Sequence, residues 1–476
     1  MPQLTRLAKL LAVTAALVIT GCVVAEQSPP AADPPRAPAE VRGTWMTTTN
    51  NEAINAPANA NAAMKQLRDI GLNTVYVELW KNGYTQFPSE VLRQTIGVDR
   101  RPHLRPGHEK YPADQMNGKP RDLLEETLIA AHRNELIYIG WFEYGFMAAF
   151  TETDNELRRQ YPHWMTKTKD GELVSDQNPF VWMNPLRPEC QDFLMAIVLE
   201  AVDKYDLDGV QLDDRIAWPV TMGYDDYTKA VYAREHNGAQ PPADPRDPAW
   251  VKWRADKVTQ FAERFYKELK NKRPNLLVSI SPAVYPWSLD NYACDWKTWN
   301  DRGWMDEFVP QAYRMDYAAF KPTWQQQVQT AGDRVGDLVA GLRIVGSGPD
   351  TTWQDTVKKI EQVRRSKAGG HCHWYSVAVL DRYPDRFKSF YNVKANGHAP
   401  NPMLPADWRP APIVAQRKGD ASWAVSVQEP GRYRVVARQG AVWREVQSRA
   451  FEAGTTTLAN LDADAVELLV DRRGEE

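Results

Sequence analysis

Between residues 41 and about 396 the chain alternates between short strand-like runs and longer amphipathic stretches. The strand-like runs cover residues 42–46, 74–79, 137–142, 209–213, 277–281, 307–311, 338–344 and 370–376. Helical periodicity is clearest over residues 62–70, 121–134, 189–205, 250–272 and 352–366. Eight strands, each followed by a helix, are typical of a (β/α)8 barrel. We therefore predict an α/β fold with a TIM barrel over residues 41–398.

The last part of the chain has a different pattern, because short alternating runs are separated there by Gly, Pro, Asp or Asn. The runs cover residues 423–427, 433–437, 442–451, 455–461 and 466–470. This spacing predicts a small β-sandwich over residues 399–476. It holds no cluster of acids, histidines or cysteines, so we expect it to pack on the barrel or to bind a partner.

The first 22 residues have the pattern of a bacterial lipoprotein signal peptide. Arg6 and Lys9 precede an apolar run over residues 10–19, which is too short to be a comfortable membrane span. Cys22 stands where that run stops, so we predict that it is lipidated. Residues 23–40 are rich in proline and read as a tether. Because Val23 follows the cysteine, we expect an outer-membrane lipoprotein that faces the periplasm.

Charge and cysteine content narrow the possible partners. Without residues 1–21 the chain has 56 basic and 61 acidic residues, a net charge of −5. This mildly acidic balance argues against nucleic acid as a partner. We expect the protein to be attached to the membrane through its lipid anchor alone. Three cysteines remain after Cys22, so at most one disulfide can form.

The run at residues 205–219 carries the clearest chemical signal. Val210 and Leu212 alternate with Gln211 and Asp213, as in a half-buried strand, and Asp214 follows directly. In a parallel barrel, catalytic residues lie at this carboxyl end of the strands. The alternative for Asp214 is a structural role, in which it caps the next helix or pairs with the following arginine.

Other strands of the predicted barrel also end in polar and aromatic residues. The acids at these strand ends are Glu78, Glu143, Asp213 and Asp214. A carboxylic acid that protonates the leaving oxygen, with a carboxylate opposite it, is what hydrolysis of a glycosidic bond needs. The chain has 18 Trp and 19 Tyr. Most of these aromatic residues pack in cores, but Trp45, Trp80, Trp218 and Trp374 occupy positions from which they could line a cleft and stack on sugar rings.

His371 and His373 share one face of the last predicted strand. With a carboxylate they could hold a metal ion, but a His-x-His pair on a strand is more often a hydrogen-bonding pair. We therefore expect neither a metal nor a cofactor.

Several motifs together resemble the family 10 glycosyl-hydrolase-like proteins of bacteria. They lie at residues 41–45, 71–76, 182–185, 205–219, 250–254, 278–282 and 309–313, in this order along the chain. The resemblance covers about residues 40–390 and implies a (β/α)8 barrel that acts on bacterial glycans. It also implies that the small β-sandwich is a fibronectin-like module. The strand that ends at Asp213 also looks like the fourth strand of the α-amylase group, in which the final Asp is the nucleophile. That second likeness ends at Ser281, where the group's acidic residue has no counterpart.

The residues and the resemblance together predict a glycosidase that cuts an extended bacterial glycan, with peptidoglycan strands as the candidate substrate. Asp213 is then the nucleophile or base, and Glu143 or Asp214 is the acid. The expected substrate-binding residues are Arg42, Trp45, Glu78, Trp80, Asn184, Arg215, Trp218, Gln311, Tyr313 and Trp374. Two alternatives stay open. One is a non-catalytic glycan-binding lipoprotein that tethers the outer membrane to the cell wall, and the other is a metal-assisted deacetylase.

Overall fold

The structure is a computed structural model that describes residues 37–104, 119–151, 153–175 and 178–474. These residues belong to one compact unit. The predicted signal peptide, Cys22 and all but the last four residues of the tether lie outside the described residues. None of the helices in the described ranges has the length and apolar character needed to cross a membrane. The boundaries expected at residues 40 and 398 stay predictions.

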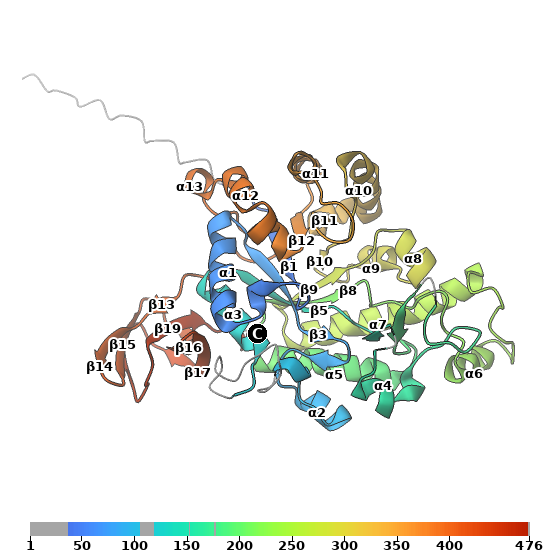
Figure 1. Cartoon of the computed structure of the whole chain (residues 1–476), viewed down its shortest axis with the longest axis horizontal. Coiled ribbons are helices and arrows are strands. Elements are labelled where there is room, and N and C mark those ends of the chain that lie inside the picture. Colours follow the sequence, from blue (N-terminus) through green and yellow to red (C-terminus); the bar gives the residue numbers. More distant parts are fainter. Residues whose placement is uncertain (1–36, 105–118, 152, 176–177, 475–476) are drawn as a thin grey trace, which may run out of the picture. The chain divides into compact units, whose positions relative to one another are not determined.

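Eight parallel strands form the barrel (Figure 1). They are β1 (Val41–Met46), β2 (Thr74–Glu78), β5 (Ile137–Phe142), β8 (Gly209–Asp213), β9 (Leu277–Ser281), β10 (Glu307–Phe308), β11 (Val339–Arg343) and β12 (Gly370–Trp374). The hydrogen-bonded order is β10-β9-β8-β5-β2-β1-β12-β11. Two isolated parallel bridges, Phe308 with Leu338 and Gln311 with Gly341, join the two ends of this sheet. The predicted TIM barrel is thus confirmed.

Helices follow the strands and surround the barrel (Figure 1). The longer ones are α1 (Pro57–Ile70), α3 (Leu123–Arg133), α5 (Pro188–Lys204), α6 (Asp226–Glu235), α7 (Pro248–Lys272), α10 (Tyr317–Ala331), α11 (Trp353–Arg365) and α12 (Pro384–Tyr391). The shorter ones are α2 (Glu90–Ile96), α4 (Glu156–Gln160), α8 (Trp287–Tyr292), α9 (Trp296–Asp301) and α13 (Val393–Asn396). Asp122, Asp247 and Thr352 accept backbone N–H groups at the starts of α3, α7 and α11, which fixes where these helices begin. Helix α10 contains Pro322. Because an internal proline argues against a helix, the sequence pattern does not indicate this one.

The C-terminal residues form two antiparallel sheets, as expected for a small sandwich. The strands are β13 (Ile413–Val414), β14 (Gln416–Gly419), β15 (Ser422–Val427), β16 (Gly431–Gln439), β17 (Val442–Phe451), β18 (Gly454–Ala459) and β19 (Ala465–Val470). One sheet has the order β13-β19-β16-β17 and the other β14-β15-β18. Strands β13 and β14 are short and largely exposed, so they lack the alternating pattern that predicts the other five.

A buried network of charges joins the sandwich to the barrel, with β17 beside α3 (Figure 1). Arg409 pairs with Asp206 at 2.8 Å and with Asp208 at 2.6 Å. His132 of α3 bonds to Asp208 at 3.0 Å, and Arg434 of β16 donates to the other nitrogen of His132. Because all five side chains are buried, each needs the others as partners.

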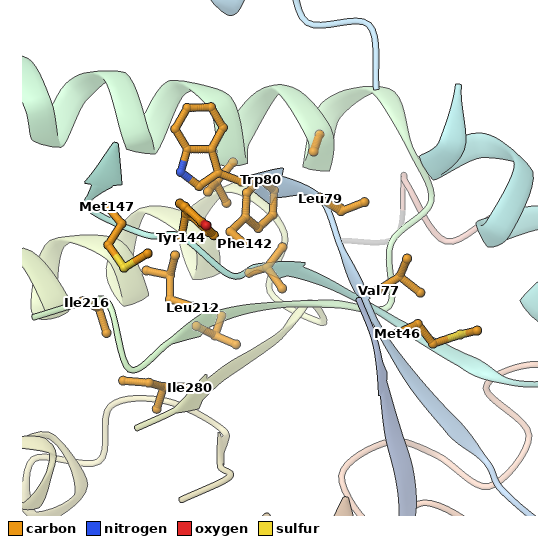
Figure 2. Packing of buried hydrophobic residues seen from close by; sticks show 14 of the residues in the cluster. Met46, Val77, Leu79, Trp80, Phe142, Tyr144, Met147, Leu212, Ile216 and Ile280 are labelled. Atoms are coloured by element: carbon orange, nitrogen blue, oxygen red, sulfur yellow. The ribbon is translucent and has the colours of Figure 1, made fainter. Parts of the chain in front are cut away.

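A continuous apolar core lies between the strands and the helices (Figure 2). Trp80 lies in this core with Leu79, Phe142, Tyr144 and Met147 (Figure 2). In the described part of the chain the three cysteines are free and buried, so none of them forms the disulfide that the sequence permits. They are Cys190, Cys294 and Cys372.

Candidate functional site

A cavity of about 720 Å³ opens at the carboxyl end of the barrel strands. Its lining residues follow β1, β2, β5, β8, β11 and β12, as expected for a site built from the loops of a barrel. They are Thr47, Thr49, Asn50, Lys81, Asn82, Glu143, Tyr144, Met147, Phe150, Thr153, Phe180, Arg215, Gly346, Ser347, Trp374 and Tyr375.

Glu143 is the carboxyl group in the wall of this cavity. Lys81 lies between Glu143 and Glu78, with its Nζ 3.2 Å from Glu143 Oε2 and 2.8 Å from Glu78 Oε2. Burial raises the pKa of Glu143, and the negative charge of Glu78 raises it further, while Lys81 opposes both. Although burial alone would raise the pKa of Glu78, the charges of Lys81 and Arg101 lower it to about 2. Glu78 is therefore a fixed anion, and Glu143 is the group that can hold a proton.

Asp213 lies at the end of β8 and is buried. Ser281 Oγ and Gln311 Nε2 each donate to its Oδ1 at 2.7 Å, and the Arg215 guanidinium pairs with its Oδ2. Burial and the adjacent charge of Asp214 raise the pKa of Asp213 well above its ordinary value. The donors instead stabilise the ionised form. This carboxyl group is thus held in one orientation by residues that follow three neighbouring strands.

Arg215 links all the candidate acids of the site. Its Nη1 lies 3.0 Å from Asp214 and 3.9 Å from Glu143, in addition to its contact with Asp213. One guanidinium nitrogen therefore brings three carboxyl groups together. Carboxylate-pair glycosidases use carboxyl groups separated by no more than roughly 9.5 Å. Arg215 lines the cavity, while Asp213 and Asp214 do not.

Aromatic residues form a cluster inside the barrel next to this site. Trp374 lines the cavity and packs on Tyr313, with ring centroids 5.7 Å apart. Trp45 packs on both at 6.0 and 6.3 Å, is 1% exposed, and donates to Gln211 Oε1 at 2.8 Å. Of these three residues only Trp374 lines the cavity, and Trp45 supports it from the interior.

Of the ten expected substrate-binding residues only Arg215 and Trp374 line the cavity, and four of the other eight have clear roles elsewhere in the fold. Arg42 lies at the start of β1, where it pairs with Glu40 at 2.7 Å. Trp80, Asn184 and Trp218 are fully buried. Trp80 donates to a backbone carbonyl, Asn184 bonds to Asp225 and Thr228, and Trp218 bonds to Thr166. Each of these side chains is already used in the fold, and none of the four lines the cavity.

The imidazoles of His371 and His373 both bond to the hydroxyl of Tyr391, at 2.8 and 3.0 Å. Burial lowers the pKa of both well below the ordinary value, so they are neutral. Within the described ranges no group of three or more His, Cys, Asp or Glu residues could hold a metal ion. The pair therefore acts as a hydrogen-bonding pair in this structure.

Three site residues escape the sequence reasoning. Lys81 lies three residues beyond the end of β2, where a strand-end rule no longer applies, and Ser281 ends β9 with an ordinary small side chain. Phe180 lies far along the segment that follows β5. The one signal that could have found Lys81 is the pair of acids, Glu78 and Glu143, which need a cation if both are buried.

A family model described as glycosyl hydrolase-like 10 matches residues 40–347. The glycosyl hydrolase YngK of Bacillus subtilis is 22% identical over 397 residues, which cover 72% of this chain and 69% of that protein. The glycosyl hydrolase DigH of Escherichia coli K12 is 24% identical over 329 residues, which cover 60% of this chain and 69% of that protein.

Solved structures support the same architecture. The glycoside hydrolase domain of PgaB (BpsB) from Bordetella bronchiseptica matches with a TM-score of 0.52 at 13% identity, over 75% of this chain and 99% of that chain. The catalytic domain of β-amylase from Paenibacillus polymyxa matches with a TM-score of 0.50 at 10% identity, over 76% of this chain and 100% of that chain. At these identities the likeness shows the barrel fold. The family match covers more than half of the sequence and includes β8 and both of its flanking strands, and the chain belongs to the glycosyl hydrolase-like 10 family.

Proposed function

We propose that this protein is a glycoside hydrolase that cuts an extended bacterial glycan, with the glycan strands of peptidoglycan as the substrate. One observation carries the proposal. A single guanidinium, that of Arg215, contacts three buried or half-buried carboxyl groups beside an open cavity of about 720 Å³. Family membership supports a hydrolase that acts on carbohydrate.

In the proposed reaction Glu143 gives its proton to the leaving glycosidic oxygen as the bond to the anomeric carbon breaks. Burial raises the pKa of both Glu143 and Asp213, and of the two only Glu143 lines the cavity, which suits it to the role of the acid. Asp213 either attacks the anomeric carbon, forming a glycosyl ester that water then hydrolyses with Glu143 as the base, or takes a proton from the water that attacks this carbon. Ser281 and Gln311 hold its carboxylate in place. In the structure Arg215 is paired with Asp213, which does not line the cavity. We therefore expect Arg215 to give up this contact as the sugar enters.

The choice of peptidoglycan rests on where the chain is expected to act. The lipoprotein pattern around Cys22 and the proline-rich tether support an outer-membrane protein that faces the periplasm, where the cell wall is the extended glycan within reach. The open cavity suits a chain more than a small enclosed sugar.

The test is mass spectrometry of products from purified peptidoglycan, with and without its stem peptides. The proteins compared are residues 23–476 and the same chain with Asp213→Asn. We expect shortened glycans from the unchanged protein and at least a thousandfold slower product formation from the variant. Full turnover by Asp213→Asn would contradict the assigned role of Asp213.

A second candidate function is glycan binding without catalysis. It is favoured by one observation: Asp213 pairs with Arg215 and does not itself line the cavity. In that case neither the unchanged protein nor the Asp213→Asn variant gives products. Both sediment with the insoluble glycan to the same extent.

A further inference from the structure

Large hydrophobic side chains are exposed at few places on the described surface. The five that are largely exposed are Phe150, Trp287, Met315, Val414 and Val446. The first three belong to segments that follow β5, β9 and β10 at the mouth of the barrel, and the last two belong to the sandwich. The two exposed aromatic residues are therefore both at the end of the barrel that holds the carboxyl groups. Exposed aromatic rings beside a cavity mark ligand contacts more often than single exposed aliphatic residues do.

Phe150 forms one exposed aromatic pair with Phe180. Their ring centroids are 5.5 Å apart, and the two residues face each other across the paired strands β6 (Met147–Phe150) and β7 (Phe180–Trp182). The backbone N–H of Phe150 donates to Asn82 Oδ1 at 2.8 Å, which ties this edge to the loop after β2. Both rings line the cavity, and the Arg215 guanidinium lies 5.9 Å from the Phe180 ring. This pair thus extends from the carboxyl cluster into solvent.

Trp287 forms a second exposed pair with Tyr292, at the two ends of helix α8. Trp287 is 48% exposed, and the ring centroids are 5.3 Å apart. The backbone carbonyl of Tyr292 accepts the N–H of Trp218 at 2.8 Å, which fixes this end of α8 against the loop after β8. Burial raises the pKa of Tyr292, and the charge of nearby Asp214 adds to it. Tyr292 also packs on Trp182 of β7, with ring centroids 6.0 Å apart, and β7 begins at Phe180, which lines the cavity.

The two pairs belong to segments that follow the two strands next to β8 in the barrel. Strand β8, which carries Asp213, has β5 on one side and β9 on the other. Phe150 belongs to the segment after β5, and Trp287 to the segment after β9. We propose that Phe150 and Trp287 are sugar-stacking platforms for units on either side of the bond that is cut, so that the enzyme cleaves within a chain.

The apolar C–H face of a pyranose ring covers an aromatic face and removes it from water, which stabilises the complex. A chain that is long enough to reach both platforms gains both contacts, while a disaccharide at the carboxyl groups gains neither. Affinity is then expected to rise with chain length. This inference rests on the proposed function, because it assumes that the glycan occupies the site of Asp213 and Glu143.

The test measures binding of peptidoglycan glycan strands, freed of stem peptides and fractionated to two and eight sugars, by calorimetry. The parent is the Asp213→Asn chain, which keeps the ligand intact. Phe150→Ala and Trp287→Ala are each expected to weaken binding of the eight-sugar chain at least fivefold and to leave the two-sugar fragment unchanged. Phe150→Tyr keeps a stacking ring and should restore the affinity. Val446→Ala removes an equally exposed apolar side chain from the sandwich and should change neither.

The result that overturns the platforms is an eight-sugar chain that binds both alanine variants as tightly as the parent. A parent that binds neither fragment overturns the proposed function as well as this inference. With the active chain, internal cleavage predicts that fragments of intermediate length precede small products. Stepwise release of one- or two-sugar units from the start would contradict it.

Discussion

At the scale of single residues, Lys81 decides how the candidate acid behaves. It lies between Glu78 and Glu143, and its ammonium group favours the ionised form of both. Glu78 and burial act in the opposite direction on Glu143. The pKa of Glu143 is thus set by two neighbours of opposite charge, and removing either one shifts it in a known direction.

The proposed acid is active while it is protonated, so activity falls as pH rises through the pKa of Glu143. Lys81→Met removes a charge that lowers this pKa, and the alkaline limb should move up by roughly one pH unit. Glu78→Gln removes a charge that raises it, and the limb should move down by a similar amount. The measurement is kcat/KM against pH. Glu52→Gln, at an exposed carboxylate, serves as the control. An alkaline limb that both site variants leave in place would show that Glu143 is not the acid.

Some site residues are predictable from the sequence because strand ends in a parallel barrel converge. Asp213, Glu143 and Gln311 follow from this rule alone. The rule gives no information once the chain has turned away from its strand. For this reason the rule does not predict Lys81 as a site residue. The same limit explains why Trp218, which the sequence suggests as a cleft residue, lies in the core.

At the scale of elements, the turn between β5 and β6 positions the site. Gly145 has a φ of +43°, and a Cβ there would meet the backbone oxygen of Arg215 at 2.6 Å. The next N–H, that of Phe146, donates to the same oxygen at 3.0 Å. The turn is thus in direct contact with the backbone that carries the bridging guanidinium. A strand pattern predicts β5 well, but it cannot predict such a contact between two loops.

Gly145→Ala is expected to push the backbone of Arg215 away and to disturb its contacts with the carboxyl groups. We expect a loss of kcat of at least tenfold and a lower Tm. Gly171→Ala is the matched control, because Gly171 also has a positive φ, +88°, but has open space at the Cβ position. It should show only the backbone strain, about 1–2 kcal/mol. Equal effects of the two changes on kcat would contradict a role for the close contact.

At the scale of the whole molecule, the barrel and the sandwich depend on each other. Asp206 and Asp208 belong to the barrel and are fully buried, and their partner Arg409 comes from the C-terminal part. Arg133 of α3 adds an ion pair with Glu467 at 2.7 Å. The sequence predicts the two folds separately because each has its own pattern. It does not predict this interface, because its charged residues read as solvent-exposed positions.

Arg409→Ala is expected to leave two carboxylates buried without their cation, which costs about 3–5 kcal/mol of unfolding free energy. Urea unfolding followed by tryptophan fluorescence measures this loss. Arg365→Ala is the control, since its pair with Glu361 is exposed and should contribute less than about 1 kcal/mol. An Arg409 variant as stable as the parent would mean that the interface contributes little to the stability of the barrel.

The seam of the barrel between β10 and β11 has a further consequence. Among the described residues two isolated bridges, at Phe308 and Gln311, join these two strands, while neighbouring pairs share longer ladders. The backbone of Gln311 also bridges to Ala283, and its side chain donates to Asp213. The weakest line of the wall therefore passes through a residue that holds the proposed nucleophile. Transient separation of β10 from β11 would therefore also disturb the position of Asp213. We expect the backbone amide protons at this seam to exchange with solvent during such openings, and a bound glycan to slow that exchange.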